Sequence, residues 1–182
     1  MKNYEKKYVV GFDPSGNWHE GKGTTGWCVF SAEDKQIIRI GELSAATFPT
    51  PEEYWNEHLK LIYDCCDRYG VDNIVIVIED YLLYASKAKE QTNSRMETPQ
   101  LIGLIKHHCW DRDIPYVTQP AAEVKKRWSN DILHYKKYIV KKGRGYALPT
   151  NQKVLSRHSI DSIRHAVHYA TFKNKPEKRK TR

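Results

Sequence analysis

The 182-residue sequence has no long hydrophobic run, because nowhere do 18 or more apolar residues follow one another. No membrane span is therefore expected. The first residues lack a long apolar stretch and a small-residue cleavage site, which argues against a secretory signal. No internal repeat occurs. A chain of this length can bury one sizeable core, so a single domain is expected.

Cysteine is also scarce, with four residues in the whole chain. Cys65 and Cys66 are adjacent, and Cys28 and Cys109 stand far from them. This spacing is typical of neither a disulfide framework nor a zinc site. We therefore expect free thiols and a cytoplasmic protein, since thiols stay reduced in that compartment.

Charge is plentiful but unevenly distributed. The net charge is +8, yet residues 1–121 carry 13 Lys and Arg against 18 Asp and Glu, a net charge of −5. Residues 122–182 carry 17 against 4, a net charge of +13. This asymmetry indicates a polyanionic partner that contacts mainly the last third of the chain. Because no lipid-binding amphipathic helix accompanies it, nucleic acid is favoured over a membrane.

The first half of the sequence predicts a strand-rich start followed by a helix. Three strands in an antiparallel meander are expected at residues 8–13, 25–30 and 36–43. Thr50 begins a helix, with Pro51 at the first helical position and Glu53 completing a capping box. Gly70 ends that helix. The continuous β-branched run at 73–80 predicts a strand buried on both faces.

The second half predicts alternating helices and strands. We expect a helix from Thr98 to the 111–113 turn, followed by a strand at 114–120 and a helix at 121–128. A last helix is expected at 155–173. Residues 129–152 mix Lys, Arg, Tyr and Gly and are interpreted as a basic arm, and 173–182 as a basic, disordered tail. The order of elements predicts an α/β fold with a mixed central β-sheet flanked by helices.

Carboxylates stand at three places where packing does not require them. Asp13 ends the first strand, Glu79 and Asp80 end the strand at 73–80, and Asp161 lies in the last helix. If these two strands are neighbours, their ends bring Asp13 and Glu79 together, and a helix that crosses those ends delivers Asp161. His158 lies one turn before Asp161.

Clustered carboxylates repel one another unless a cation neutralises them. Mg²⁺ prefers hard oxygen ligands, and a few carboxylates suffice to hold it. Two such ions about 4 Å apart activate a water and stabilise the leaving oxygen in phosphodiester hydrolysis. A basic protein with this cluster is therefore interpreted as a metal-dependent nuclease.

Each of these positions also has a simpler interpretation. Asp13 begins an Asp-Pro-Ser-Gly turn, and Glu79 with Asp80 would suit a solvated strand end. In the last helix one face, within an arc of about 80°, would hold His158, Asp161, His165 and His168. The opposite face would hold Ile160, Ile163, Val167 and Ala170, as in an amphipathic helix with one wet side.

Several segments resemble motifs of the RuvC family of Holliday junction resolvases. The stretch GFDPSG followed by TTGWCVF resembles the first motif, and VIED, with Glu79, resembles the second. QPAAEVKKRW resembles the segment before the last helix, and HSIDSIRHAVHY, with His158 and Asp161, resembles the final motif. These segments follow in the family's order over residues 8–172, nearly the whole chain.

The resemblance implies an RNase H-like fold over residues 1–172 and a homodimer that binds four-way DNA junctions. It implies that two Mg²⁺ ions, with Mn²⁺ as a substitute, are held by the four catalytic residues Asp13, Glu79, His158 and Asp161. The reaction would be paired nicking of opposed strands that leaves 5′-phosphate ends. No small-molecule cofactor and no membrane partner are expected.

DNA contacts are expected from basic and aromatic residues, only some of which follow from the resemblance. The resemblance implies that Lys125 and Lys126 lie near the scissile phosphate. Further DNA-binding residues are expected at Arg127, Lys136, Lys137, Lys141, Lys142 and Arg144. Where bacterial members have a stacking Phe this chain has Leu82, so Tyr81 or Tyr84 is assigned to stacking on a base, with packing in the core as the alternative for either. That difference and the long arm favour a phage-type resolvase; Asp80 is a further possible ligand.

Other functions fit parts of the sequence. A nuclease of the same fold that acts on forks or other branched DNA would share every motif. A nucleic-acid-binding protein without activity would explain the basic third but not the four competent side chains. The stretch GFDPSG…GTTGW also resembles the first phosphate loop of sugar-kinase and actin-like ATPases, in which Gly and Thr backbone groups bind phosphate.

Overall fold

A computed structural model of the chain describes residues 6–81 and 95–174. At its centre is a five-stranded sheet in the order β3-β2-β1-β4-β5. Its strands are β1 Tyr8–Asp13, β2 Thr24–Ser31, β3 Gln36–Ser44, β4 Ile74–Asp80 and β5 Tyr116–Pro120. The first three pair antiparallel, as the predicted meander requires. β1 pairs in parallel with β4, and β4 with β5, so the sheet is mixed as expected.

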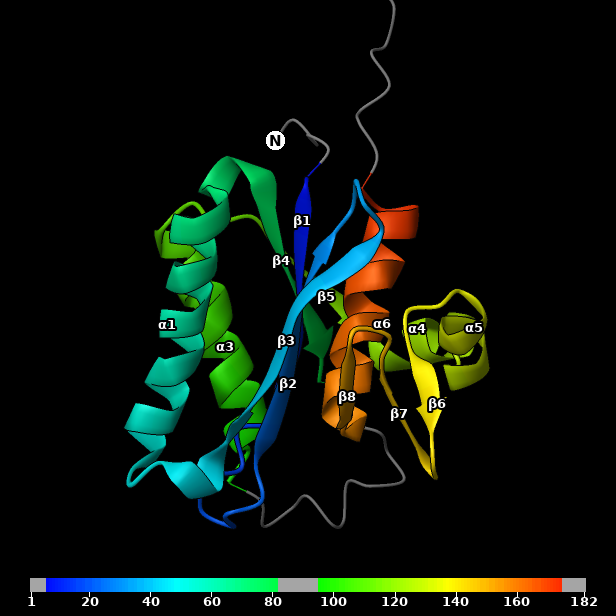
Figure 1. Cartoon of the computed structure of the whole chain (residues 1–182). Coiled ribbons are helices and arrows are strands. Elements are labelled where there is room, and N and C mark those ends of the chain that lie inside the picture. Colours follow the sequence, from blue (N-terminus) through cyan, green and yellow to red (C-terminus); the bar gives the residue numbers. More distant parts are fainter. Residues whose placement is uncertain (1–5, 82–94, 175–182) are drawn as a thin grey trace, which may run out of the picture.

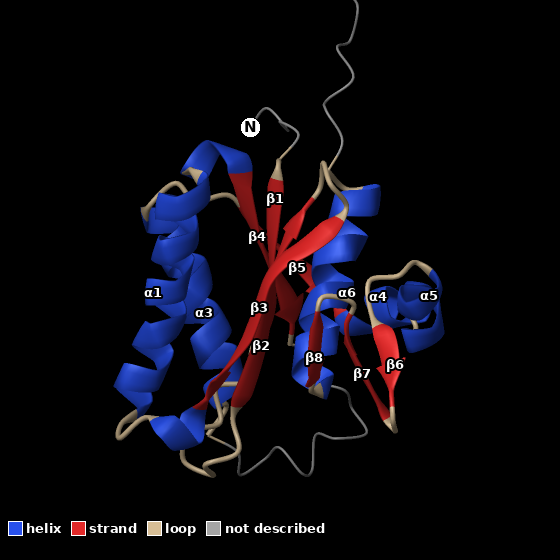
Figure 2. Ribbon diagram, in the orientation of Figure 1, coloured by secondary structure: helices blue, strands red, loops and turns tan. Residues whose placement is uncertain are grey.

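Helices cover both faces of this sheet (Figures 1 and 2). On one face lie α1, Pro51–Tyr69, and α3, Glu97–Asp111. On the other lies α6, Arg157–Phe172, with the short helices α4, Ala121–Arg127, and α5, Asn130–Tyr135. Single turns of 3₁₀ helix, Ala45–Thr47 and Val71–Asn73, precede α1 and β4. This arrangement confirms the predicted α/β fold, a mixed central sheet flanked by helices.

The two ends of α1 follow the predicted signals. The Thr50 side chain accepts a hydrogen bond from the backbone N–H of Glu53, and Pro51 occupies the first turn. Gly70 ends the helix with a φ of 81°, a conformation that strongly favours glycine. α3 begins at Glu97, one residue earlier than the sequence predicts, after Met96 in a left-handed conformation.

The apolar run of β4 divides its side chains between two layers, because successive residues of a strand point to opposite faces. Ile74, Ile76 and Ile78 pack with the layer under α1 and α3. Val75 and Val77 pack with the layer under α6. Both faces of the strand are buried, as the continuous run predicts. The same alternation decides where the carboxylates beyond Ile78 point.

The basic segment 129–152 is folded rather than extended. After α5 it forms a three-stranded antiparallel sheet of β6 Val140–Lys142, β7 Gly145–Leu148 and β8 Asn151–Val154. Its apolar side chains Leu133, Ile139 and Leu148 are buried in the core layer that α6 shares. β8 extends this unit two residues beyond the predicted range, and from here on the basic arm means residues 129–154. Its β6–β7 turn reaches the end of the molecule at which α6 begins (Figure 1).

Three further observations concern the sequence expectations. All four cysteines are buried as free thiols. Among the described residues, no helix is long and apolar enough to cross a membrane. The predicted tail beyond residue 174 lies outside the described residues, as do Leu82 and Tyr84.

Candidate metal centre

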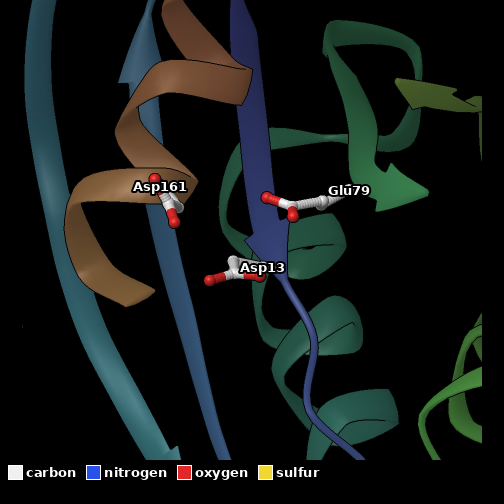
Figure 3. A group of neighbouring side chains, drawn as sticks. All are labelled: Asp13, Glu79 and Asp161. Atoms are coloured by element: carbon white, nitrogen blue, oxygen red, sulfur yellow. The ribbon is translucent and has the colours of Figure 1, made fainter. Parts of the chain in front are cut away.

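Asp13, Glu79 and Asp161 meet at one end of the sheet (Figure 3). One ligand atom from each lies within 4.8 Å of those from the other two. Asp13 comes from the end of β1, Glu79 from the end of β4 and Asp161 from the first turns of α6. The three carboxylates that the sequence singled out are thus brought together, in a geometry that can hold a divalent cation.

Strand alternation explains why these carboxylates share a face. β1 and β4 run in parallel with Phe12 opposite Ile78, so Asp13 and Glu79 occupy the next position on each strand. Both side chains point to the face that α6 covers. Asp80 is one residue further and points to the opposite face, beside Ile78. The structure therefore gives no support to Asp80 as an additional ligand.

Two glycines allow α6 to come close enough to deliver Asp161. A Cβ atom on Gly11 would lie 2.3 Å from the carbonyl oxygen of Ser162, and one on Gly26 would lie 2.1 Å from that of His158. Both distances are far below van der Waals contact. Gly26 stands directly opposite Asp13 in the β1–β2 pair. The glycines of the GFD and TGW segments therefore serve helix packing at the site.

His158 lies beside the carboxylate group. Its Nδ1 is 2.7 Å from Oδ2 of Asp13, and its side chain is partly exposed. This hydrogen bond raises the pKa of His158 above its ordinary value. Burial raises the pKa of Asp13; the bond to His158 opposes that rise, and the negative charges of Glu79 and Asp161 add to it. A cation in the cluster would relieve this repulsion.

Lys125 of α4 bridges two of the carboxylates. Its Nζ is 3.2 Å from Oε1 of Glu79 and 3.1 Å from Oδ2 of Asp161. Burial opposes the charged ammonium, but the two carboxylates outweigh burial and raise the pKa of Lys125. Asp161 also accepts a hydrogen bond from Arg164, whose guanidinium donates to the Trp128 carbonyl as well. The predicted position of Lys125 near the site agrees with this geometry.

Sequence reasoning missed two members of the site, His165 and Gln119. Nε2 of His165 is 2.9 Å from Oε2 of Glu79, and Nδ1 is 3.0 Å from Oε1 of Gln119. Burial alone would raise the pKa of Glu79, but the contacts with His165 and Lys125 outweigh it and hold that pKa below its ordinary value. The one signal in the sequence was the position of His165 a helical turn after Asp161.

The interpretation of the last helix as amphipathic with a wet side is wrong. Asp161, His165 and His168 are 2%, 0% and 1% exposed, although they share the face assigned to solvent. The opposite face is buried as well, through Ile163 and Val167. The helix is covered all round over these turns because the sheet lies on one side and α4 with the basic arm lies on the other.

The residues predicted to bind DNA are spread over α4 and the basic arm. Exposed to solvent are Lys126, Arg127, Lys136, Lys137, Lys141 and Arg144, and Lys142 is half-buried. Tyr81 is half-buried against the apolar layer under α1 and α3, which favours a packing role over base stacking. Tyr84 lies outside the described residues. The DNA contacts themselves stay a prediction.

The loop after β1 does not have the free amides of a phosphate loop. The backbone N–H of Ser15 donates to Oγ1 of Thr25, and that of Gly16 donates to Oγ1 of Thr98. The buried side chain of Glu97 also lies at this loop, where it contacts His19. Two amides that a phosphate would need are already used, and a nearby carboxylate repels anions, so the structure disfavours the kinase-like alternative.

Comparisons with known proteins agree with this fold. No protein-family model matches the chain, and no curated protein matches it. By structure the chain is similar to Thermus thermophilus RuvC in complex with a Holliday junction substrate, with a TM-score of 0.63 and 13% identity over 90% of this chain and 92% of that one. A second T. thermophilus RuvC structure gives a TM-score of 0.60 at 13% identity over 90% and 93%.

The yeast mitochondrial Holliday junction resolvase Ydc2 is similar too, with a TM-score of 0.53 and 14% identity over 92% of this chain and 78% of that one. At such low identity these similarities concern the fold. They confirm the predicted RuvC-like, RNase H-like fold over nearly the whole chain. The narrower expectation of a phage-type member stays a prediction.

Proposed function

We propose that this protein is a metal-dependent endodeoxyribonuclease that resolves four-way DNA junctions by paired nicking of opposed strands, leaving 5′-phosphate ends. The observation that carries the proposal is the group of Asp13, Glu79 and Asp161 at the ends of two parallel strands. These carboxylates lie in a fold similar to that of RuvC, a protein whose structure has been solved with a Holliday junction substrate.

The donor set fits a divalent cation. Asp13, Glu79 and Asp161 would hold it through carboxylate oxygens, with His158 as the fourth ligand; Mg²⁺ suits the oxygens, and the imidazole makes Mn²⁺ an effective substitute. Lys125 already sits as a cation between two of these side chains. When bound, two such ions would supply the positive charge that activates water and stabilises the leaving oxygen.

The chain's own basic residues would bind and orient the DNA. Lys125 neutralises a phosphate near the site, and Lys126 and Arg127 extend the basic surface along α4. The basic arm continues it with Lys136, Lys137, Lys141, Lys142 and Arg144. Its β6–β7 turn lies at the same end of the molecule as the beginning of α6 (Figure 1), so one duplex can contact both.

Paired nicking requires two active sites, and we propose a homodimer. The outer side of α3 supports it: Leu104 and Trp110 are 37% and 70% exposed. Gly103 precedes Leu104 directly and lies seven residues, about two turns, before Trp110 on the same helix, and no atom lies within 4 Å of the place where its Cβ would stand. A glycine inside a helix costs about 1 kcal/mol relative to alanine. Close approach of a second copy would explain its presence.

The proposal includes the compartment. Four buried free thiols support a reducing environment such as the bacterial cytoplasm, where a phage-encoded resolvase would act on host or phage DNA.

The direct test uses a mobile four-way junction and a linear duplex of the same sequence, each incubated with Mg²⁺, Mn²⁺ or EDTA. We expect metal-dependent paired nicks near the branch point that Asp161→Asn abolishes while junction binding survives. Asp80→Asn is the matched control, because Asp80 points to the opposite face of β4, and it should still cut. Equal cutting of forks and junctions would favour a general branched-DNA nuclease. If the protein cuts neither substrate with either metal, the proposed nuclease activity is refuted.

A further inference from the structure

We infer that His165 is a positioning residue of the metal centre: through Nε2 it holds the carboxylate of Glu79 in the orientation that a divalent cation requires. The inference rests on the proposed function, because it takes Glu79 as a ligand. It assigns a role to a buried histidine that the ligand set leaves out.

The two oxygens of Glu79 have different partners. Oε2 faces Nε2 of His165 at 2.9 Å, and the His165 side chain is 0% exposed. Oε1 faces Nζ of Lys125 at 3.2 Å, and the Lys125 side chain is 32% exposed. The lysine has room to move aside when a cation enters, whereas the histidine is enclosed. His165 is therefore the partner that persists and fixes the carboxylate.

Gln119 holds the ring in turn. It stands opposite Glu79 in the β4–β5 pair and is buried, and its Oε1 is 3.0 Å from Nδ1 of His165. Its Nε2 is buried without a hydrogen-bond partner among the described residues. A carboxylate only accepts, so Nε2 of His165 must carry a proton and donate it to Glu79. Gln119 holds Nδ1 at the other end of the ring, through its amide oxygen if Nδ1 carries a proton and through the NH₂ of the reversed amide if it does not.

Helix geometry links this contact to the other ligands. His165 follows Asp161 by four residues, so both project from one side of α6. His158, which contacts Asp13, lies two turns before His165 on the same helix. The single helix α6 therefore supplies two of the proposed ligands, Asp161 and His158, and contacts the other two carboxylates through His158 and His165. Groups that hydrogen-bond to metal ligands in this manner typically change metal affinity about 10–100-fold when they are removed.

The test measures Mn²⁺ binding to the full chain by titration calorimetry, separately from cleavage. His165→Leu removes the donor and should weaken Mn²⁺ binding about 10–100-fold. His165→Gln places an amide N–H near the position of Nε2 and should restore most of the affinity. His168→Gln is the matched control, because His168 is equally buried in α6 but contacts none of the three carboxylates. It should bind Mn²⁺ like the wild-type chain.

Circular dichroism would reveal whether His165→Leu misfolds. A second variant tests the inference in that case. Gln119→Met keeps the imidazole but removes the group that holds Nδ1 of the ring, and it should weaken Mn²⁺ binding by a smaller factor. Unchanged affinity in folded His165→Leu or in Gln119→Met would overturn the inference. So would wild-type protein that binds no Mn²⁺. If the Mn²⁺ affinity depends on His165 but the protein cuts no junction, the inference is supported and the proposed nuclease is refuted.

Discussion

Gly11 of β1 and Ser162 of α6 touch backbone to backbone: a Cβ on the glycine would lie 2.3 Å from the Ser162 carbonyl oxygen. Gly11→Ala must therefore push α6 off the sheet. We expect a loss of about 1–3 kcal/mol in the free energy of unfolding, the usual cost of overpacking. Because Asp161 would move with α6, junction cleavage should fall more than the stability loss explains.

Urea denaturation and cleavage assays would measure both effects. Val10→Ala, at the neighbouring buried position, is the control: it destabilises by leaving a cavity but keeps α6 in place. Equal losses of cleavage in the two variants at equal stability would contradict the account given for Gly11.

Removal of the Lys125 ammonium should make the protein depend on metal for stability. In Lys125→Met the carboxylates of Glu79 and Asp161 lose their shared partner. The metal-free protein should lose about 1–3 kcal/mol of unfolding free energy, and added Mn²⁺ should raise Tm by more than it does in the wild-type chain. Thermal denaturation with and without Mn²⁺ measures this. Lys126→Met, at the next and exposed position, should behave as wild type; if it does not, general charge removal is responsible.

Stability should decline in weak acid because His58 is buried without charge. Burial lowers the pKa of this histidine from 6.5 to about 4. Between those pH values the unfolded chain binds a proton that the folded chain excludes, so stability is lost as pH falls below about 6.5. The loss from this residue should reach about 2 kcal/mol at pH 5.

Urea denaturation of the wild-type chain and of His58→Gln, at pH 7.5 and pH 5, isolates the contribution of this residue. His58→Gln should be less stable at neutral pH, since His58 bonds both Thr25 and the Tyr54 carbonyl. Its stability should nevertheless fall less between the two pH values. Parallel pH profiles would show that other groups cause the decline.

The basic arm should account for part of the salt dependence of DNA binding. Each neutralised phosphate contributes about −0.9 to the slope of log K against log salt concentration. In the double variant Lys141→Gln with Arg144→Gln, the slope should become shallower by up to about 1.8. Binding of a four-way junction at several salt concentrations measures the slope. Lys60→Gln, on α1 and the far face of the sheet, should leave it unchanged.

A charge on the outer side of α3 should separate the proposed dimer. Leu104→Glu should yield monomers in analytical ultracentrifugation and single rather than paired nicks in a junction. Val71→Glu is a matched control, because both side chains are 37% exposed and Val71 lies in the turn before β4. A wild-type chain that sediments as a monomer even with junction DNA would refute this interface.

Much of the site could be predicted because its residues mark the ends of regular elements. Asp13 and Glu79 follow apolar strands whose buried residues identify them, and strand alternation then fixes which face each carboxylate takes. The start of α1 was predictable for a similar reason, since Thr50 and Glu53 interact within one turn. Such short-range patterns do not depend on how distant parts of the chain pack.

The features that could not be predicted depend on distant contacts. His165 meets Glu79 across 86 residues of sequence, and no local pattern distinguishes it from His168 on the same helix. The strands of the basic arm have three or four residues each, too short for a period of two to appear. Their burial comes from Trp128 and the core layer of α6, which the segment's own charged composition conceals.

The dependence of the carboxylate cluster on α6 has a consequence for biosynthesis. Asp13 and Glu79 leave the ribosome long before Asp161 does, and neither His158 nor His165 is present until α6 has been made. A nascent or truncated chain that lacks this helix has only two of the three carboxylates, without their histidine partners. If the proposed nuclease is correct, no partly synthesised product could nick DNA, and activity would begin only when the last helix docks on the finished sheet.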